Sequence, residues 1–522
     1  MPRNKQKQLV IWMALGVFAY ALVVRVVFVS QIEQIGFFHQ PVSDGAIYDL
    51  RAQEIAAGDW LGPPEFVHAP LYAYLLGGIN LVFGHDLETV RFVQAALGAM
   101  SCVLIMLACS RFFDSSVALV AGILLASYPP AIFFDGLIQK TSLATFLSAC
   151  LVWLLAACRD RSSRPRWLAT GMVLGLLGLT RQNALALAPL LLAWQWFVDG
   201  KQLRSRRLAH SGLLVAGLVA ALLPWVVRNR VVTGEFVLTT PNLGQNFAMG
   251  NHPSATGTYL PFKRGRSNAE HEQREWIRAA ERSAGRPLTA SEVSNYYLNS
   301  ALDYIESNPA PWLKLTARKW LMVWNAYEAP DTEDYYLYKE WSPMLRFLDR
   351  LLHFGVLFPL AAAGCVMTWT RRRELWPLYG WLLITAVAVM IFVVFARYRF
   401  PLVPVLVLFA AAAVIDTARR LRGAVQKQAP SNWRAFAIPI LALGGTALIA
   451  NRTVLHERRP YPTSYTNHAV ALADGGRFDE AIAELEKSFA LAPDDVDAHL
   501  VMGSVLLDLH GFEAAASHYD RA

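Results

Sequence analysis

The chain has 522 residues, of which 55% are hydrophobic and only 17% are charged, and its formal net charge is +8. A soluble protein normally carries about a quarter charged residues, so this composition excludes an ordinary soluble enzyme. The surplus of Lys and Arg does not indicate nucleic-acid binding, because these residues cluster in short gaps between apolar segments, which is typical of membrane proteins.

The first apolar segment, residues 8–30, follows Arg3, Lys5 and Lys7. Its length of about 23 residues, at ~1.5 Å per residue, is enough to cross a ~30 Å hydrocarbon core. Because no small-residue cleavage site follows it, we predict a retained membrane-spanning helix and not a signal peptide.

Ten further apolar segments follow along the chain. They lie near residues 90–110, 115–132, 138–157, 167–180, 184–198, 209–227, 347–369, 375–395, 401–416 and 433–450. If each segment crosses once, the basic gaps all fall on the cytoplasmic side with the N-terminus. These gaps are residues 159–166, 201–207, 371–373 and 419–427. We therefore predict an all-α, multi-pass bundle of about eleven spans in the plasma (inner) membrane.

The first outer loop, residues 31–88, contains a short amphipathic helix with Ser43 or Asp44 as its N-cap and Gly58 past its end. A further apolar stretch, residues 70–84, must have both of its ends outside for the charge pattern to hold. It is short for a span, so we predict a helix that lies on the outer membrane face.

Several charged residues are predicted at the outer ends of the spans. Asp135 and Lys140 lie in the second outer loop, where the alternative for Asp135 is to cap the next helix and for Lys140 to snorkel. Five arginines occupy similar positions, and for each the alternative is snorkelling at a helix end. They are Arg181, Arg228, Arg230, Arg397 and Arg399.

The large outer insertion, residues 229–345, is predicted to be a small folded domain. Thr289 and Glu292 form a capping-box pattern for a helix that ends near Asn308. We predict that its buried face consists of Tyr296, Tyr297, Leu302, Tyr304 and Ile305. Trp312, Trp320 and Trp324 suit a membrane-interface belt. We interpret the insertion as a docking surface with little chemistry of its own.

The tail beyond the last span repeats with a period of 34 residues, as Phe478 and Phe512 or Ala481 and Ala515 illustrate. This spacing resembles the tetratricopeptide repeat, in which helix hairpins stack and bind protein partners. The second repeat stops at Ala522 without a polar capping helix, so either the array is short or further repeats are missing from this chain.

The predicted domains are a membrane module (1–228), the insertion (229–345), further spans (346–450) and an outer repeat domain (464–522).

Several different short motifs lie between residues 8 and 420, and all of them are predicted on the outer face. They are Asp44 with Tyr48, the A-x-x-I-A-x-G helix at residues 52–58, Pro70-Leu71-Tyr72, Leu179-Thr180-Arg181, the segment 224–229, Gly250-Asn251-His252-Pro253 and Arg397-Tyr398-Arg399-Phe400-Pro401. In these motifs and their order the chain resembles the family 39-like GT-C membrane glycosyltransferases, which include protein O-mannosyltransferases and the lipid A aminoarabinose transferase. It departs from them at His68-Ala69, where relatives commonly have Lys-Pro.

The resemblance implies inverting transfer of a hexose or pentose from a polyprenyl-phosphate carrier to a protein, lipid or glycan acceptor at the outer face. Asp44 is expected to be the catalytic base, or to orient the acceptor if the acceptor is itself a phosphate, and Asp135 is the candidate second carboxylate. The residues expected to bind the donor phosphate are Arg397, Arg399, Arg228, Arg181 and Lys140. Those expected to position substrate are Tyr48, His68 and Tyr72.

Neither outer loop has the density of Asp and Glu of a dedicated metal cage, so the sequence assigns no metal site and leaves a divalent metal open. The five cysteines show neither metal-ligand spacing nor a disulfide framework and are interpreted as packing residues. Neither a P-loop nor a dinucleotide fingerprint is present, which favours a lipid-linked donor over a nucleotide sugar.

Two other functions fit the same spans. One is a catalytically inactive scaffold that presents the repeats for assembly of envelope proteins, which Asp44 and the outer arginines argue against. The other is a secondary transporter, but the apolar segments lack the buried acidic residues and paired broken helices of that class.

Overall fold

The computed structural model describes residues 3–63, 68–259, 269–425, 434–454 and 458–522, and these residues form helices and connecting loops without a β-strand. Lys427, at the end of the last predicted basic gap, lies outside the described residues. The all-helical class predicted from the sequence is therefore confirmed for the described part of the chain.

Seven helical segments of the described residues are long and apolar enough to cross a membrane. They are formed by α1 (Arg3–Gln31), α5 (Leu87–Phe112), α8 (Thr141–Asp160), α11 (Arg204–Thr233), α17 and α18 (Pro343–Leu351 and Phe354–Met367), η2 and α19 (Trp369–Arg371 and Arg372–Ile391), and α20, η3 and α21 (Ala396–Arg399, Phe400–Leu402 and Val403–Val425). The protein is thus a multi-pass membrane protein.

An eighth crossing is possible where α6 (Ser115–Ala126) meets α7 (Pro129–Gly136) at an angle of 51°. Pro129 and Pro130 explain this break, because proline lacks the N–H that would continue the helix. The other predicted spans form shorter helices, which are α9 (Arg164–Thr180), η1 with α10 (Gln182–Leu187 and Ala188–Val198), and α22 (Arg434–Asn451). The count of eleven spans therefore stays a prediction.

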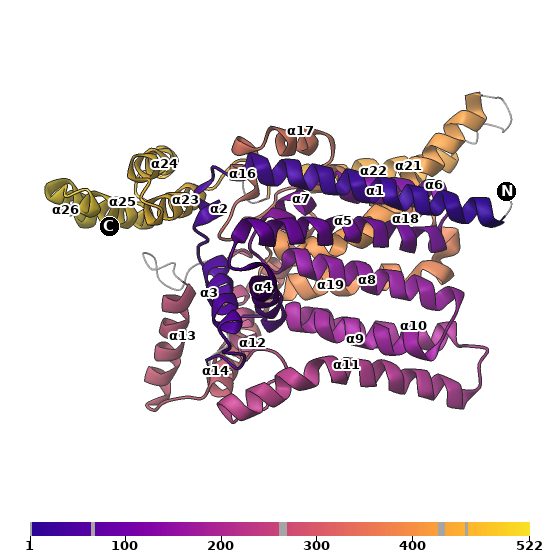
Figure 1. Cartoon of the computed structure of the whole chain (residues 1–522), viewed down its shortest axis with the longest axis horizontal. Helices are drawn as coiled ribbons and strands as arrows, with labels where there is room; N and C mark the ends of the chain where they lie inside the picture. Colours follow the sequence, from indigo (N-terminus) through magenta and orange to yellow (C-terminus); the bar gives the residue numbers. More distant parts are fainter. Residues whose placement is uncertain (1–2, 64–67, 260–268, 426–433, 455–457) are drawn as a thin grey trace.

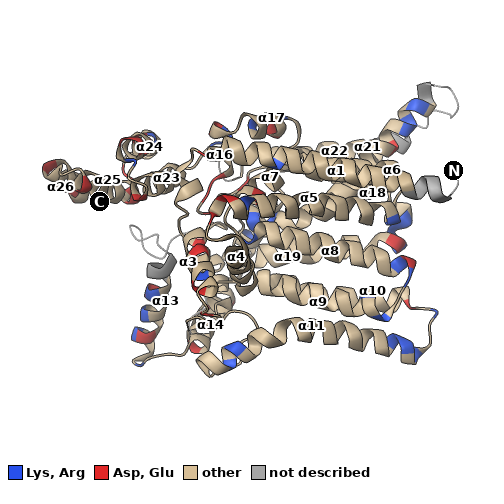
Figure 2. Ribbon diagram, in the orientation of Figure 1, with Lys and Arg blue, Asp and Glu red and all other residues tan. Residues whose placement is uncertain are grey.

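The spans lie side by side, and most of the remaining helices gather at the end of the bundle opposite the N-terminus (Figure 1). These are α2 (Gly36–His39), α3 (Asp44–Ala56), α4 (Pro70–Phe83), α12 (Leu243–Gly250), α13 (Ala269–Ala284), α14 (Ala290–Ser307), α15 (Pro309–Val323) and α16 (Tyr335–Trp341). Figure 2 shows Lys and Arg at the other end, where α8, α10 and α11 meet their loops.

Helix α4 does not run with the spans but packs against α3 (Figure 1), and its predicted place on the outer membrane face stays a prediction. The two helices approach closely at Gly77, where a Cβ would lie 2.6 Å from the Ile55 side chain. This packing joins the C-terminal half of α3 to α4.

The insertion contains the predicted capping box, since Thr289 and Glu292 bond reciprocally at the start of α14. The predicted buried face is wrong for Tyr296 and Leu302, which are 38% and 47% exposed, whereas Tyr297 is buried and Tyr304 and Ile305 are partly buried. Helix α14 instead buries a stripe of smaller residues around one tyrosine. The insertion core consists of Ala248, Ala280, Val293, Tyr297 and Ala301.

The C-terminal part of the insertion belongs to the core of the bundle rather than to a separate domain. Met322, Val323 and the tyrosines of α16 are buried in the same cluster as the spans. Trp324 of the predicted belt stacks on Phe358 of α18 at 4.6 Å between ring centroids. The segment between α15 and α16 is therefore covered by the bundle on one side.

The tail forms four helices that pair as two hairpins, α23 (Pro462–Asp474) with α24 (Phe478–Leu491) and α25 (Val496–Asp508) with α26 (Phe512–Arg521). A small core of its own joins the hairpins, with Ala481 and Leu485 facing Ala498 and Met502. The tail lies at the same end of the bundle as α2 and α3 (Figure 1).

Helices α9 and α11 touch backbone to backbone through glycine, a packing mode that is common between membrane helices. A Cβ at Gly217 would overlap the Leu168 carbonyl oxygen. We expect Gly217→Ala to lower the free energy of unfolding by about 1–3 kcal/mol, because neither backbone can move away easily. Gly212→Ala on the same helix meets nothing within 4 Å and should be neutral or stabilising. Thermal unfolding in detergent measures both, and equal midpoints would contradict this packing.

Candidate active site

The start of α3 presents the Asp44 carboxylate to two partners from distant parts of the chain. Arg397 Nη1 donates to Asp44 Oδ2 at 2.7 Å, and His68 Nε2 lies 3.0 Å from Asp44 Oδ1. The N-cap position belongs to Ser43, whose side chain makes no capping bond and whose φ is 51°, an uncommon value for a residue with a Cβ. Asp44 is thus directed at a cation and does not cap its helix.

Arg397 is shared between two carboxylates. Its Nη2 lies 2.6 Å from Asp331 Oδ2, while Nη1 contacts Asp44. Arg397 is only 8% exposed, so little water screens these two ion pairs. The backbone fixes the second partner, because Ala396 N donates to the Ala329 carbonyl at 3.0 Å.

Two further cations lie beside this pair of bridges. Lys140, just before α8, interacts electrostatically with Arg397 and Asp44. Arg181, at the end of α9, donates from Nη2 to Thr141 Oγ1 at 2.9 Å. We call Asp44, Asp331, Arg397, Lys140 and Arg181 the Arg397 cluster. It holds three basic side chains against two carboxylates.

The pKa values show how tightly these charges interact. Burial and the nearby Arg397 lower the pKa of Lys140 to about 7, and the same causes lower that of Arg181 to about 10. For Asp44, burial opposes the charged form, but Arg397 and His68 outweigh it and hold the pKa well below its ordinary value. Burial raises the pKa of Asp331 despite Arg397. Asp44 therefore carries the firmer negative charge of the two.

Aromatic side chains form one wall of the site. The Tyr48 ring meets those of His68 and Tyr72 edge to face, with centroids 5.5 and 4.9 Å apart. Tyr72 Oη donates to Gln94 at 2.8 Å, which fixes it. Within the described part of the chain, Tyr48 Oη and the Nε atoms of Arg181 and Arg397 are buried without a hydrogen-bond partner. Buried donors of this kind are costly unless a ligand satisfies them.

Three residues that we expected at the site are engaged elsewhere. Arg228 donates from Nε to the Leu61 carbonyl at 2.7 Å and also bonds the Pro63 carbonyl. Asp135 forms a buried ion pair with Arg25, at 2.6 Å. Arg228 is thus held by carbonyls and Asp135 by an ion pair, and neither is directed at the Arg397 cluster. The predicted roles of Arg228 at the phosphate and of Asp135 as second carboxylate stay predictions that these contacts do not favour.

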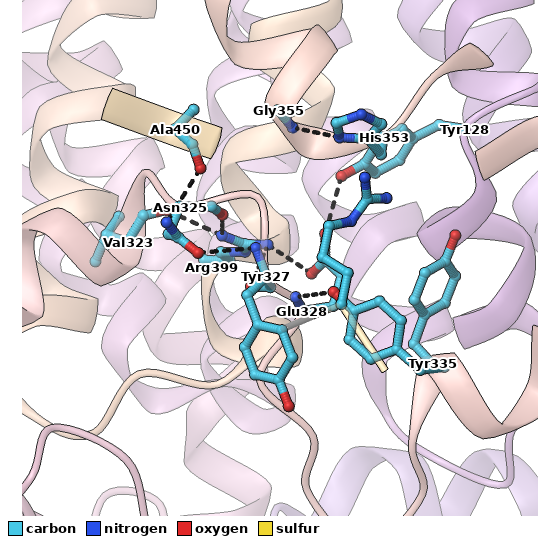
Figure 3. Close-up of polar contacts among 12 residues, drawn as sticks. Tyr128, Val323, Asn325, Tyr327, Glu328, Tyr335, His353, Gly355, Arg399 and Ala450 are labelled. Atoms are coloured by element: carbon cyan, nitrogen blue, oxygen red, sulfur yellow. Dashed lines mark hydrogen bonds and ion pairs between the residues drawn. The ribbon is translucent and has the colours of Figure 1, made fainter. Parts of the chain in front are cut away.

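Arg399 is the third such residue, and Figure 3 shows it at the centre of a network of backbone acceptors. Its guanidinium donates to the carbonyls of Val323, Asn325 and Tyr327 and pairs with Glu328 at 2.8 Å. It thereby fixes the segment that leads to Asp331, and it is not directed at the Arg397 cluster.

Asp331 is not among the site residues predicted from the sequence, and it lies in the acidic segment Asp331-Thr332-Glu333-Asp334. The sequence pattern alone favours a docking surface with little chemistry for this part of the insertion. A run of three acids beside buried aromatics in an outer loop was the available signal. Burial raises the pKa of the neighbouring Glu333 to about 7, so its charge also changes near neutral pH.

The described residues do not bring three or more His, Cys, Asp or Glu side chains into a group suited to a metal ion. The five cysteines are free, and Cys102, Cys109 and Cys158 are buried, as packing residues would be.

Comparison with known proteins identifies a shared region. Residues 67–227 match the model of a family described as dolichyl-phosphate-mannose-protein mannosyltransferase. Undecaprenyl phosphate-alpha-4-amino-4-deoxy-L-arabinose arabinosyl transferase 1 of Pseudomonas fluorescens is 27% identical over 197 residues. The aligned part is 36% of this chain and 36% of that relative, so the match spans about a third of each protein.

Two solved structures are also similar. Archaeal oligosaccharyltransferase AglB from Archaeoglobus fulgidus, in complex with an inhibitory peptide and a dolichol-phosphate, aligns with a TM-score of 0.46 and 15% identity over 90% of this chain and 59% of that one. ArnT from Cupriavidus metallidurans, bound to undecaprenyl phosphate, aligns with a TM-score of 0.38 and 16% identity over 78% of this chain and 79% of that one.

The pairing of Arg399 with Glu328 predicts an asymmetric stability effect. Arg399→Met should lower the free energy of unfolding by about 3–5 kcal/mol, because it leaves the Glu328 carboxylate buried and unpaired. The double variant with Glu328→Gln should recover part of that loss, since no charge then stays buried alone. Thermal unfolding in detergent tests this, and a single variant as stable as the wild type would contradict the structural role.

Proposed function

We propose that the protein is a membrane glycosyltransferase that transfers a sugar from a polyprenyl-phosphate carrier to an acceptor at the end of the bundle that holds Asp44. The observation that carries this proposal is the sharing of Arg397 between Asp44 and Asp331, with Lys140 and Arg181 beside it. The cluster has one cation more than its carboxylates can neutralise, which suits a phosphate anion.

In the proposed reaction the acceptor hydroxyl attacks the anomeric carbon from the side opposite the phosphate. The new glycosidic C–O bond forms as the bond from the anomeric carbon to the phosphate oxygen breaks. The hydroxyl proton passes to Asp44, and the bonding electrons leave with the polyprenyl phosphate, where Arg397, Lys140 and Arg181 stabilise the charge. If the acceptor is itself a phosphate, Asp44 orients it and takes no proton.

The low pKa of Asp44 belongs to the state in which Arg397 pairs with it. This pairing keeps the carboxylate ionised and so able to accept a proton, but it weakens Asp44 as a base. A donor phosphate would compete for Arg397 and thereby raise the basicity of Asp44 when the donor is in place. Tyr48 and His68, which line the same wall, are proposed to position the substrate with Tyr72 behind them.

The comparisons support the proposal through part of the site. The matched region, residues 67–227, includes His68, Tyr72, Lys140 and Arg181, and the descriptions of both the family and the Pseudomonas relative name lipid-phosphate-linked glycosyl transfer. Asp44, Asp331 and Arg397 lie outside it. Their roles rest on the geometry of this chain.

The orientation follows from the charge pattern. We propose that the basic end of the bundle in Figure 2 is cytoplasmic and that the site lies at the extracytoplasmic face of the inner membrane. The two tail hairpins are proposed to act as tetratricopeptide-like repeats for a protein partner, on the same side as the site. The inactive-scaffold alternative leaves the surplus of buried cations unexplained.

Replacement of the proposed base gives the most direct test. Asp44→Asn should reduce transfer by about 10²–10⁴-fold, because the amide can neither accept the proton nor pair with Arg397. In a strain that lacks this chain, mass spectrometry of glycolipids, glycans and glycoproteins identifies the missing product, which the wild-type chain should restore and Asp44→Asn should not.

Asp49→Asn is the matched control, since Asp49 lies on the same helix but contacts His85 and Gln53 instead of the cluster. It should restore the product as the wild type does. Full restoration by Asp44→Asn would remove Asp44 from the mechanism, and unchanged glycoconjugates in the strain without the chain would contradict the proposed function itself.

The pKa of Lys140, about 7, predicts a pH dependence of phosphate binding. Lys140 is charged below this value and neutral above it, so the affinity for undecaprenyl phosphate should fall about tenfold as the pH rises through it. The Arg side chain in Lys140→Arg stays charged throughout, so the affinity of this variant should no longer fall as the pH rises. Lys140→Met should bind undecaprenyl phosphate weakly at every pH. Binding between about pH 6 and pH 9 measures the profiles, and parallel profiles for wild type and Lys140→Arg would exclude Lys140 as the titrating group.

A further inference from the structure

The first helix of the tail is bonded to the acidic segment that carries Asp331. Tyr461 N and Ser464 Oγ donate to Asp334 Oδ2, at 3.1 and 2.6 Å. Asn467 Nδ2 donates to the Thr332 carbonyl at 3.0 Å. Asp334 is fully buried, so these bonds replace the water that its carboxylate would otherwise need.

The same hairpin also contacts the segment that leads to Asp44. Gly36 N donates to His468 Nε2 at 3.1 Å, and Arg477 donates to the Gln34 carbonyl at 2.9 Å. The fit is close, because a Cβ at Gly36 would lie 3.1 Å from the Leu472 side chain and backbone. Figure 1 shows α23 next to α2. The tail thus touches both of the segments that bring a carboxylate to Arg397.

Asp331 lies between two fixed parts of the chain. On its N-terminal side, Arg399 holds residues 323–328 and Ala396 holds Ala329. On its C-terminal side, the bonds that hold Thr332 and Asp334 come from the tail and from the neighbouring backbone N–H of Tyr336. The position of the Asp331 carboxylate therefore depends on tail residues about 130 positions further along the chain.

We infer that the first tail hairpin is a positioning element of the active site. Ser464 and Asn467 hold the Asp331 carboxylate in contact with Arg397, and this contact limits how strongly Arg397 pairs with Asp44. If Asp331 is displaced, Arg397 is left to pair with Asp44 alone, and a donor phosphate must then break that pair before it binds. This inference rests on the proposed function for its consequence at the phosphate, but the link between tail and acidic segment can be measured separately.

The test uses the full chain in lipid nanodiscs and the double variant Ser464→Ala with Asn467→Ala. Amide hydrogen exchange of residues 329–335 should become at least about tenfold faster, because two of the bonds that hold the segment are lost. Exchange in α5 and α8 should stay unchanged. The affinity for undecaprenyl phosphate should fall about fivefold.

A second background tests whether the tail acts through Asp331. In a chain that carries Asp331→Asn, the tail double variant should change the undecaprenyl phosphate affinity by less than about twofold, since the group that it positions is already gone. Ser464→Thr retains the hydroxyl and should bind as the wild type does. Glu486→Ala, at an exposed position on α24, is the control within the tail and should change neither measurement.

Three outcomes are informative in different ways. Unchanged exchange of residues 329–335 in the double variant would overturn the inference. An equal loss of affinity in the chains with and without Asp331 would also overturn it, because the tail would then act independently of that carboxylate. A wild-type chain that does not bind undecaprenyl phosphate would instead contradict the proposed function, and with it the role of the tail at the phosphate.

Discussion

The site depends on one guanidinium that two carboxylates share. Arg397 and Asp44 are 353 residues apart in sequence, and Asp331 comes from a third part of the chain. A single buried arginine neutralises only one of two ionised carboxylates, so the acids compete for it, and Asp44 holds its charge more firmly than Asp331 does. Lys140 and Arg181 then tip the local balance towards positive charge. The cluster therefore holds the surplus of basic side chains on which the proposed binding of a phosphate rests.

The arrangement of α20 explains why neighbouring arginines have different roles. Residues two positions apart on a helix point about 200° apart, because each residue turns the chain by about 100°. Arg397 therefore faces α3, while Arg399 faces the opposite way and holds residues 323–328 through their carbonyls (Figure 3). One arginine leaves an exchangeable ion pair at the site. The other holds the segment that leads to Asp331.

Much of this could be predicted from the sequence where the signal was local. Apolar length and basic gaps indicated the long spans, and the Thr289 and Glu292 pattern gave the capping box of α14. The placement of Asp44 and Arg397 at one end of the bundle followed from alternating spans. The span boundaries at Pro129 and around Arg181 do not follow from composition alone. Short and broken helices are stabilised by their neighbours as much as by their own residues.

The remainder depended on contacts that no local pattern encodes. Arg228, Arg397 and Arg399 all look alike in sequence, as arginines at the outer ends of apolar segments, but only the folded chain shows which carbonyls or carboxylates are within reach of each. Arg228 donates to the Leu61 and Pro63 carbonyls, Arg399 pairs with Glu328, and Arg397 pairs with Asp44 and Asp331. The partners of the acidic residues could not be predicted from local sequence either. Asp135 pairs with Arg25 inside the bundle, whereas Asp331 pairs with Arg397 at the site.

The acidic segment shows how one short turn joins three parts of the molecule. Asp331 pairs with Arg397, Glu333 accepts a bond from Tyr338 of α16, and Asp334 accepts bonds from the tail. The three acids lie within four consecutive residues, so they share one short stretch of backbone. The ion pair of Asp331 with Arg397 and the docking of the tail therefore depend on the same short backbone segment, which is the basis for the inferred link between the tail and the proposed phosphate site.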